Sequence, residues 1–256
     1  MLQFKDQEYD NSLNNFKKAF KILPDENVSD YFYAAAAALH LNKEDEAKSL
    51  IIQSIIETNA SKNYFLNFKE FDRFRHLDLF REIERNSDSH IAEFYKNLKH
   101  PNIYREIDSM LVKDQEIRTS GVTSQEFNSV DSLNINRLIE ITQEYGWQDK
   151  GWLILWHQRG TYKEDNYVWN FFLPHINKEI KAGTVRKRFW AIFEDEKLIL
   201  KEKKQIFGEY YGQFPIIDIE NVDARRDSLG LPPLWYMNKI YNIDLPAEYK
   251  TTANNI

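Results

Sequence analysis

The chain has 256 residues, of which 42% are hydrophobic and 29% are charged, and its formal net charge is -6. This length and composition predict one large or two ordinary globular domains and exclude an intrinsically disordered chain. The negative charge provides no global field for nucleic acid, and no apolar run approaches the ~20 residues of a membrane span. Cysteine is absent, which excludes disulfides, cysteine-ligated zinc and a cysteine nucleophile.

Two segments near the start of the chain share one spacing pattern. In EYDNSLNNFKKAFKILP, Ser12 is followed by Phe16, Ala19 and Pro24 at offsets of four, seven and twelve residues. KEDEAKSLIIQSIIETN repeats these offsets further along the chain: Ala47, Ile51, Ser54 and Asn59. Between them, DYFYAAAAALHLN predicts a helix whose alanines allow close approach of its neighbours.

These spacings resemble the second helix of a tetratricopeptide repeat, whose period is ~34 residues. Two generic helical hairpins are the alternative. The resemblance implies stacked helices with a concave face that is free to bind a peptide or a partner protein.

The register of the repeat places the start of the first unit just before residue 1, so most of its leading helix would be missing. We therefore expect that the natural protein begins earlier, and a secretion signal could have stood there. No signal peptide is visible in the chain as it stands. The expected compartment is cytoplasmic for this sequence, or periplasmic or envelope-associated if a signal preceded it.

Aromatic residues recur from 62 to 86, and Phe68, Phe71 and Phe74 step by three as on one stripe of a helix. This stripe predicts a cap over the open end of the repeat stack. NSDS at 86–89 predicts a turn, and Pro101 predicts a break. The expected organisation is a repeat region at 1–88, a connector at 89–102, a helical domain at 103–245 and a frayed tail at 246–256.

The apolar periodicity of the second part predicts further helices. Ser129 to Asp131 is expected to cap one of them, a helix pair is expected to be broken or kinked near Pro174, and Thr184 is expected to cap a long helix. IFGEY and QFPII flank Tyr211-Gly212, which predicts a short hairpin. The predicted fold is therefore all-α, with tetratricopeptide-like helical hairpins and a helical domain that contains one short β-hairpin.

A set of polar motifs runs through the second part. D-Q-x-x-R is followed by a histidine at the end of a buried helix, then Q-x-[FY]-G, then R-R-x-x-x-G-L-P-P-L. Residues 103–243 thereby resemble an uncharacterised bacterial family, the domain of unknown function 6624. The matching positions are Asp114, Gln115, Arg118, His157, Gln205, Gly208, Arg225, Arg226 and Gly230.

The chain departs from this family pattern at two places. The family commonly has Asp two residues after the histidine, where this chain has Arg159, and Asp-Arg in the long helix, where this chain has Asp195-Glu196. The resemblance implies a mostly helical fold and supplies no chemistry.

His157 is the candidate acid or base, because its ordinary pKa lies near neutrality. The alternative is a histidine that bonds to the free carbonyls at a helix C-terminus. No HExxH or HxH spacing occurs around His157 or His175, so we expect no metal site. No cofactor is expected either, since phosphate-cradling and dinucleotide motifs are absent.

Arg118, Arg225 and Arg226 are candidates for holding an anion, with Gln205 as a polar wall, since guanidinium groups bind phosphate and carboxylate bidentately. In the alternative, Asp114 forms a clamp with these arginines that ties the last helices to the first, and Gln115, Gly208 and Gly230 are structural.

The leading functional hypothesis is a protein-interaction or scaffold module that uses the repeat face. The alternative is a small-ligand or anion-binding enzyme in the second part. Nucleic acid is not expected as a partner.

Overall fold

The computed structural model describes residues 1–22, 27–120 and 124–250. Helices make up most of these residues, and no strand occurs among them; their β pairing is limited to an isolated parallel bridge between Gln205 and Ile216. The predicted all-α fold is therefore confirmed, whereas the predicted β-hairpin is wrong. No helix in the described ranges is long and apolar enough to cross a bilayer.

The chain divides into two compact units, Met1–Pro101 and Asn102–Ile256, which are described separately. The first unit has one apolar cluster that reaches from Phe4 to Ile83. The second unit has a large cluster around Trp169 and Phe193 and a smaller one around Leu234. Each unit thus has a core of its own.

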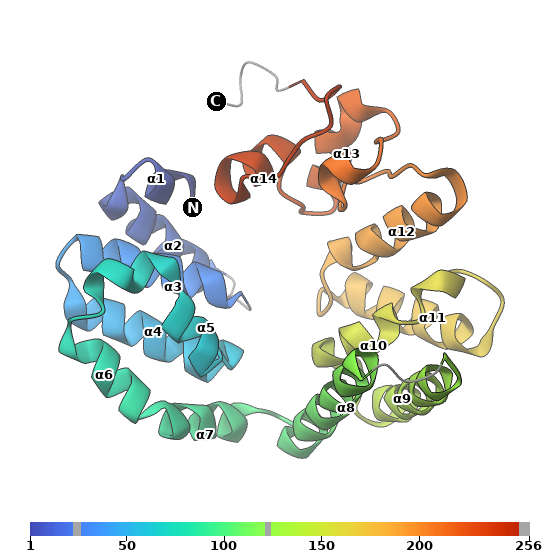
Figure 1. The fold of residues 1–256 in the computed structure, drawn as a ribbon, viewed down its shortest axis with the longest axis horizontal. Helices are drawn as coiled ribbons and strands as arrows, with labels where there is room; N and C mark the ends of the chain where they lie inside the picture. The colour runs from blue at the N-terminus through green and yellow to red at the C-terminus, as the bar shows by residue number, and fades with distance from the viewer. Residues whose placement is uncertain (23–26, 121–123, 251–256) are drawn as a thin grey trace. The chain divides into compact units, whose positions relative to one another are not determined.

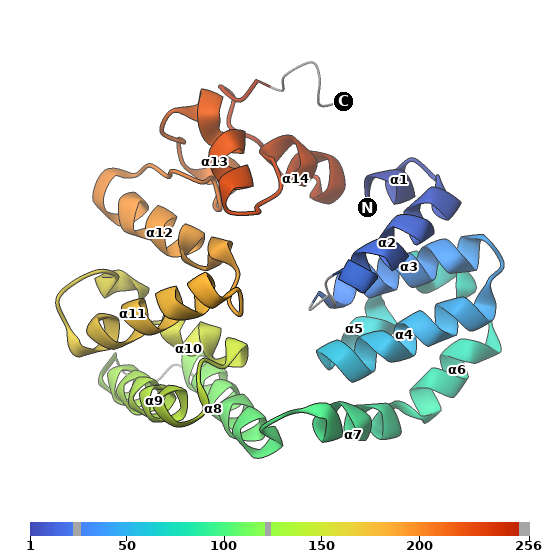
Figure 2. The ribbon, with the colours of Figure 1, turned by 180° about the vertical axis from the view of Figure 1, so that it is seen from behind.

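The first unit begins with a stack of helices: α1 (Leu2–Lys5), α2 (Tyr9–Ile22), α3 (Val28–His40) and α4 (Glu44–Thr58). α3 packs against both α2 and α4 (Figure 1 and Figure 2). The Asn27 side chain caps α3 by accepting from the Ser29 amide at 3.1 Å, and Asn59 ends α4 with a left-handed φ of 54°. The helical hairpins expected from the repeat pattern are confirmed; Pro24 lies outside the described residues.

The five consecutive alanines of α3 explain how closely these helices approach. Ala34, Ala35, Ala36, Ala37 and Ala38 are all fully buried. A helix buried on every side needs small residues where its neighbours come near, and alanine also has the highest helix propensity.

The remaining helices of the first unit are α5 (Lys62–Asn67), the 3-10 helix η1 (Lys69–Phe74), α6 (Asp78–Arg85) and α7 (Ser87–Asn97). The starts of α3 and α5, at Val28 and Lys62, are separated by the same interval as the starts of α4 and α6, at Glu44 and Asp78. This interval matches the period of the tetratricopeptide repeat. Helices α5 and α6 therefore follow α3 and α4 at the same interval, and η1 lies between them. The sequence motif did not reveal this recurrence.

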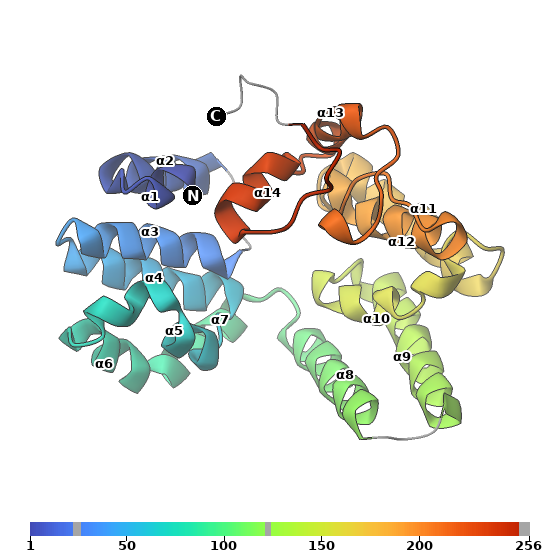
Figure 3. The ribbon, with the colours of Figure 1, turned by 45° about the horizontal axis from the view of Figure 1, so that its top comes forward.

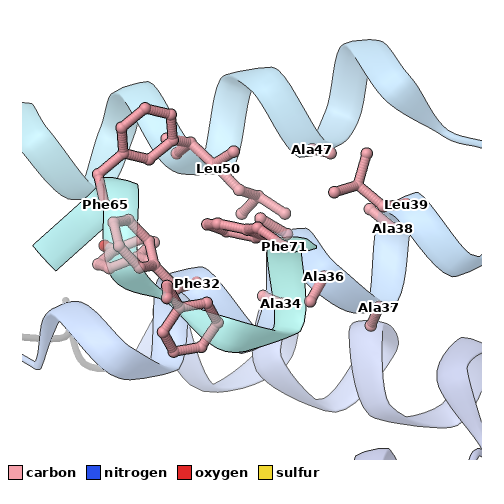
Figure 4. Close-up of a cluster of buried hydrophobic side chains, with 14 of the residues drawn as sticks. Phe32, Ala34, Ala36, Ala37, Ala38, Leu39, Ala47, Leu50, Phe65 and Phe71 are labelled. Carbon is pink, nitrogen blue, oxygen red and sulfur yellow. The ribbon is translucent and has the colours of Figure 1, made fainter. Parts of the chain in front are cut away.

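The phenylalanine stripe packs on the face of α3. Phe71 lies between the alanines of α3 and Leu50 of α4 (Figure 4), while Phe68 contacts Phe32 and Tyr33 edge to face. Steps of three residues place side chains on one line in a 3-10 helix, because such a helix has three residues per turn. The stripe therefore produces a 3-10 turn, where the sequence had suggested an α-helix.

The expected turn at 86–89 and connector at 89–102 are wrong. Asn86 is a single turn residue, and α7 continues to Asn97. Pro101 then opens α8 (Pro101–Thr119), where its missing N–H costs no helical hydrogen bond.

The second unit is a succession of helices. After α8 come α9 (Ser124–Tyr145), η2 (Asp149–Gly151), α10 (Trp152–Trp156), η3 (Arg159–Thr161), α11 (Tyr167–Ala182), η4 (Lys187–Trp190), α12 (Ala191–Glu202), η5 (Tyr211–Gln213), η6 (Ile219–Asn221), α13 (Val222–Ser228) and α14 (Leu234–Tyr241). The α11 segment begins where Asn166 accepts from the amides of Val168 and Trp169, and ends at Gly183 with a φ of 79°.

Three boundary predictions for this unit are wrong. Ser129 to Asp131 lie inside α9, which already starts at Ser124. α11 is one helix that contains Pro174, so the expected helix pair is not broken there. Thr184 caps no following helix; its hydroxyl donates to the Glu179 carbonyl at 3.0 Å, at the end of α11.

The expected frayed tail is also partly wrong. The Tyr249 hydroxyl donates to Asp223 Oδ2 at 2.5 Å and accepts from the Trp235 amide at 3.2 Å. The tail is thereby attached to α13 and α14 as far as residue 249. The rest of the expected tail from 251 lies outside the described residues.

Candidate functional site

Asp114 is the centre of a polar cluster near the end of α8. Its side chain is buried and accepts hydrogen bonds from Gln115 Nε2 at 2.8 Å and from Arg118 Nε and Nη2 at 3.0 and 3.1 Å. Arg118 and Asp114 are four residues apart on one helix, a spacing that brings side chains together. The carboxylate is therefore paired mainly within its own helix.

Arg118 also connects α8 to α9. Its Nη2 atom lies 2.5 Å from Asp131 Oδ1, and its guanidinium covers the Phe127 ring at 5.4 Å. Two carboxylates and an aromatic face thus surround this guanidinium.

His157 follows the last residue of α10 and lies against this cluster. Its Nε2 atom is buried and 3.0 Å from Asp114 Oδ2, yet no acceptor among the described residues is aligned for a hydrogen bond with it. Burial lowers the pKa of His157 below its ordinary 6.5; the charges of Arg118 and Arg159 act in the same direction, and those of Asp114 and Asp131 oppose them.

The pKa of Asp114 shifts in the direction that keeps the carboxylate ionised. Burial alone would raise its pKa, but the Arg118 hydrogen bond, the charge that His157 carries when it is protonated, and the charge of Arg118 hold the pKa below its usual range. The site at neutral pH is therefore an ionised carboxylate in contact with a neutral imidazole.

A second polar group surrounds Arg159, which lies two residues after His157 in the sequence. Arg159 Nε lies 3.1 Å from Glu196 Oε1, and its guanidinium stacks over Trp156 at 4.7 Å. The Tyr210 hydroxyl donates to the other oxygen of Glu196 at 2.5 Å. Arg159 and Glu196 are thus partners of one another.

The segment from Gln205 to Ile217 is held by side chains of its surroundings. Asp195, fully buried on α12, accepts from the backbone amides of Ile206, Phe207 and Glu209 at 2.6, 2.8 and 2.9 Å. Sequence reasoning noted Asp195 only as part of a departure from the family pattern. Its signal was a single acid inside an otherwise apolar helical stripe.

Gln205 has a comparable role from inside the segment. Its fully buried amide donates to the carbonyls of Tyr211 and Phe214 at 2.7 and 2.6 Å and accepts from the Tyr210 amide at 3.0 Å. Both polar atoms of the Gln205 side chain are therefore bonded to the backbone of the segment. Side-chain-to-backbone bonds replace the ladder of the expected hairpin.

Gly208 lies where the backbone of this segment approaches the side chains of Ile216 and Leu234. Its φ is 74°, and a Cβ atom would lie 2.8 Å from Ile216 Cδ1. Any other residue would combine a left-handed conformation with a steric clash. Gly230, with a φ of 71°, follows α13 as predicted.

The tandem arginines are each occupied. Arg225 donates to the carbonyls of Ile206, Ile217 and Asp218 and pairs with the Asp218 carboxylate at 2.9 Å. Arg226 is 1% exposed; it donates to the carbonyls of Pro232 and Phe207, both at 2.6 Å, and pairs with Glu209 at 2.9 Å.

These contacts correct the predicted clamp. Asp114 binds Arg118 and contacts His157, whereas Arg225 and Arg226 pair with Asp218 and Glu209. Each of the candidate arginines is therefore paired with at least one carboxylate. No group of three or more His, Cys, Asp or Glu residues suited to a metal ion occurs in the described parts of the chain.

Comparison of the chain with models of protein families, with curated proteins and with solved structures finds no match.

Proposed function

We propose that this protein is a protein-interaction module, with a tetratricopeptide-like first unit that binds a peptide of its partner. The recurrence of helix starts from Val28 to Lys62 and from Glu44 to Asp78 supports the repeat, since both intervals equal the period of that family. The resemblance of the second unit to the domain of unknown function 6624 is part of the same proposal.

One observation carries the binding proposal: a row of four aromatic rings crosses successive first helices of the repeats. We call Phe4 of α1, Tyr33 of α3, Phe68 at the start of η1 and Tyr64 of α5 the aromatic row. Neighbouring rings lie 5.1, 5.1 and 5.9 Å apart between centroids. Because the rings come from α1, α3 and the α5–η1 segment in turn, the row runs across the stack.

The two tyrosines bring this row to the surface. Phe4 and Phe68 are buried, whereas Tyr33 is half-buried and Tyr64 is 38% exposed. Tyrosine gives a large contact area with few rotatable bonds, which makes it frequent at the centres of protein interfaces.

Asp30 adds a negative charge beside the row. Burial raises the pKa of the Tyr64 hydroxyl, and the charge of Asp30 raises it further. Ring faces favour an Arg or Lys side chain through cation–π contacts. The expected partner sequence is therefore a short segment with a basic residue beside an apolar one.

The anion-binding alternative has less support. It needs His157 and the arginines to present free groups to a common cleft, and each arginine has a carboxylate partner instead.

The experiment is a selection of random 12-residue peptides against the full chain, followed by fluorescence anisotropy with the enriched peptides. Tyr33→Ala and Tyr64→Ala are expected to weaken binding at least about tenfold, as substitutions of central interface tyrosines do. Tyr167→Ala removes an exposed tyrosine of the second unit and is expected to leave the dissociation constant unchanged. Equal affinity of both first-unit variants and the wild type, with unchanged folding by circular dichroism, would refute the proposal.

A further inference from the structure

The last turns of α12 in the second unit present lysines to solvent with an apolar residue between them. Lys197, Leu200 and Lys201 are three and four residues apart, a spacing that places side chains on one side of a helix. Leu200 is 54% exposed, and the Lys201 side chain is 75% exposed. Asp195 and Ile199, on the opposite side, are buried. Figure 3 shows α12 with α11 beside it.

Two further lysines extend this positive charge beyond the helix. Lys203 and Lys204 directly follow α12 and are exposed. Among the described residues, Lys197, Lys203 and Lys204 form no ion pair, and Lys201 lies 3.6 Å from Glu202. We call this surface the lysine face; its members are Lys197, Leu200, Lys201, Lys203 and Lys204.

The other acids of α12 do not neutralise the lysine face, because each is bonded elsewhere. Asp195 accepts from backbone amides of the segment that follows. Glu194 pairs with Lys163, and the ion pair of Glu196 is with Arg159. The lysine face is therefore positive although the chain as a whole has a net charge of -6.

Leu200 is the residue that points to a partner. Lysines at the end of a helix also complement the helix dipole, so their presence alone does not require one. A leucine exposed between them has no such role, and covering its apolar surface is favourable. A partner that fits the lysine face therefore offers negative charge together with an apolar region.

The composition of the lysine face distinguishes between anionic partners. Nucleic acid is bound by aromatic stacking and by guanidinium forks, whereas α12 has no arginine, and its aromatic residue, Phe193, is buried. Protein interfaces are depleted in lysine and enriched in tyrosine, tryptophan and arginine. Clusters of lysine are typical of contact with anionic lipid headgroups, where the ammonium groups stay hydrated.

We propose that the lysine face binds the surface of a bilayer that contains anionic lipids. The ammonium groups lie at the level of the lipid phosphates, and Leu200 enters the boundary between headgroups and acyl chains. The contact is reversible, since a few charges and one leucine bind a membrane weakly. It involves the second unit alone and does not depend on the proposed peptide binding by the first.

The test is co-sedimentation of the full chain with vesicles of phosphatidylglycerol mixed with phosphatidylcholine. Binding to these mixed vesicles is expected, and none to vesicles of phosphatidylcholine alone. Binding is expected to fall steeply as sodium chloride is raised from about 0.05 to about 0.5 M, because the Debye length shortens about threefold.

Paired substitutions test the charges of the face. Lys197→Gln with Lys201→Gln is expected to lower the partition coefficient at least about fivefold, which is the contribution of one lysine near an anionic surface. Lys197→Arg with Lys201→Arg keeps both charges and is expected to bind as the wild type does. Lys18→Gln with Lys21→Gln removes two exposed lysines from α2 and is the matched control, with no change expected.

A single label tests the place of contact. The chain has no cysteine, so Leu200→Cys provides one position for a dye whose emission depends on its surroundings. The emission is expected to shift to the blue with mixed vesicles, because the dye enters the apolar boundary. The same dye on Leu133→Cys, at a position of α9 that is 69% exposed, is expected to show no shift.

Several outcomes would overturn the proposal: no binding to mixed vesicles, equal binding to both kinds of vesicle, or an equal loss in the α2 control. Equal emission shifts at the two labelled positions would place the contact elsewhere and reject the lysine face. Tighter binding of a single-stranded oligonucleotide or of polyglutamate than of mixed vesicles, lost on substitution of Lys197 and Lys201, would assign the face to nucleic acid or to protein.

Discussion

Arg159 and Glu196 form an ion pair, with Arg159 Nε 3.1 Å from Glu196 Oε1. They occupy the two positions at which the sequence indicates a departure from the pattern of the domain of unknown function 6624. That pattern has Asp at the first position and Arg at the second, so the proposed resemblance would place the same pair of charges there in exchanged order.

A charge-exchange cycle tests this pair. Arg159→Asp and Glu196→Arg alone are each expected to destabilise the second unit, because each leaves two like charges in contact. The double variant is expected to recover part of the loss, with a coupling free energy of about 1 kcal/mol. Recovery stays incomplete because Glu196 also accepts from Tyr210. Urea unfolding measures all four proteins.

The control is the same exchange at Lys201 and Glu202, whose side chains are 75% and 42% exposed. Exposed pairs contribute little, so no coupling is expected there. Additive effects of Arg159→Asp and Glu196→Arg would contradict the paired exchange.

His157 predicts a loss of stability at mildly acid pH. Its pKa is lowered in the folded chain, so the unfolded chain takes up the proton first. The contribution of the neutral imidazole is present above its unfolded pKa of about 6.5 and is lost as pH falls towards the lower folded value. The charged groups around it are Asp114, Arg118, Asp131 and Arg159.

The measurement is the free energy of unfolding in urea from about pH 7.5 to about pH 5.5, the range in which histidine titrates. His157→Gln is expected to show a flatter dependence than the wild type. His76→Gln removes a histidine outside this cluster and should keep the wild-type slope. Identical slopes in all three proteins would rule out the buried neutral imidazole.

Asp195→Ala is expected to release the segment that follows α12. It removes the acceptor of three backbone amides, at a cost of about 3 kcal/mol or more. Hydrogen exchange is expected to accelerate at Ile206, Phe207 and Glu209, with little change in α8 or α9. Glu202→Ala, at an exposed position of the same helix, should leave exchange unchanged. Full protection of these three amides in Asp195→Ala would contradict the role given to this carboxylate.

Phe71→Ala is expected to destabilise the first unit by about 3–5 kcal/mol, the usual range for removal of a buried phenylalanine. Phe71 is fully buried against α3 and α4. Leu66→Ala removes a side chain that is 40% exposed and is expected to cost less than about 1 kcal/mol. Unfolding of the two units is followed separately, since multidomain chains need not unfold in one step. Equal losses in the two variants would contradict the place given to Phe71 in the core.

The helices of the first unit could be predicted because their signals are local. Apolar periodicity, the alanine run and Asn59 are all visible within a few turns of chain. The recurrence at α5 and α6 could not be predicted in the same way, because Phe68 interrupts the first helix and the small residues of the spacing pattern are replaced. The repeat interval was still present at Lys62 and Asp78, where α5 and α6 begin.

The path of the Gln205 segment could not be predicted, because the residues that determine it lie outside the segment. Its glycines, proline and aromatics are compatible with a hairpin locally. Its path is decided by Asp195 and Arg225, which lie ten residues before it and eight after it in sequence. Of the candidate site, the Asp114–Arg118 pair follows from helical spacing, but the approach of His157 requires the packing of α10 against the rest of the unit.

A segment whose path depends on side chains outside it cannot be grafted alone onto another protein. A β-hairpin brings its own backbone pairing wherever it is moved. The Gln205 segment would lose its path unless Asp195 on α12 and the two arginines on α13 were moved with it. Its smallest portable piece is therefore the whole stretch from α12 through α13, and a shorter graft would be an unstructured loop.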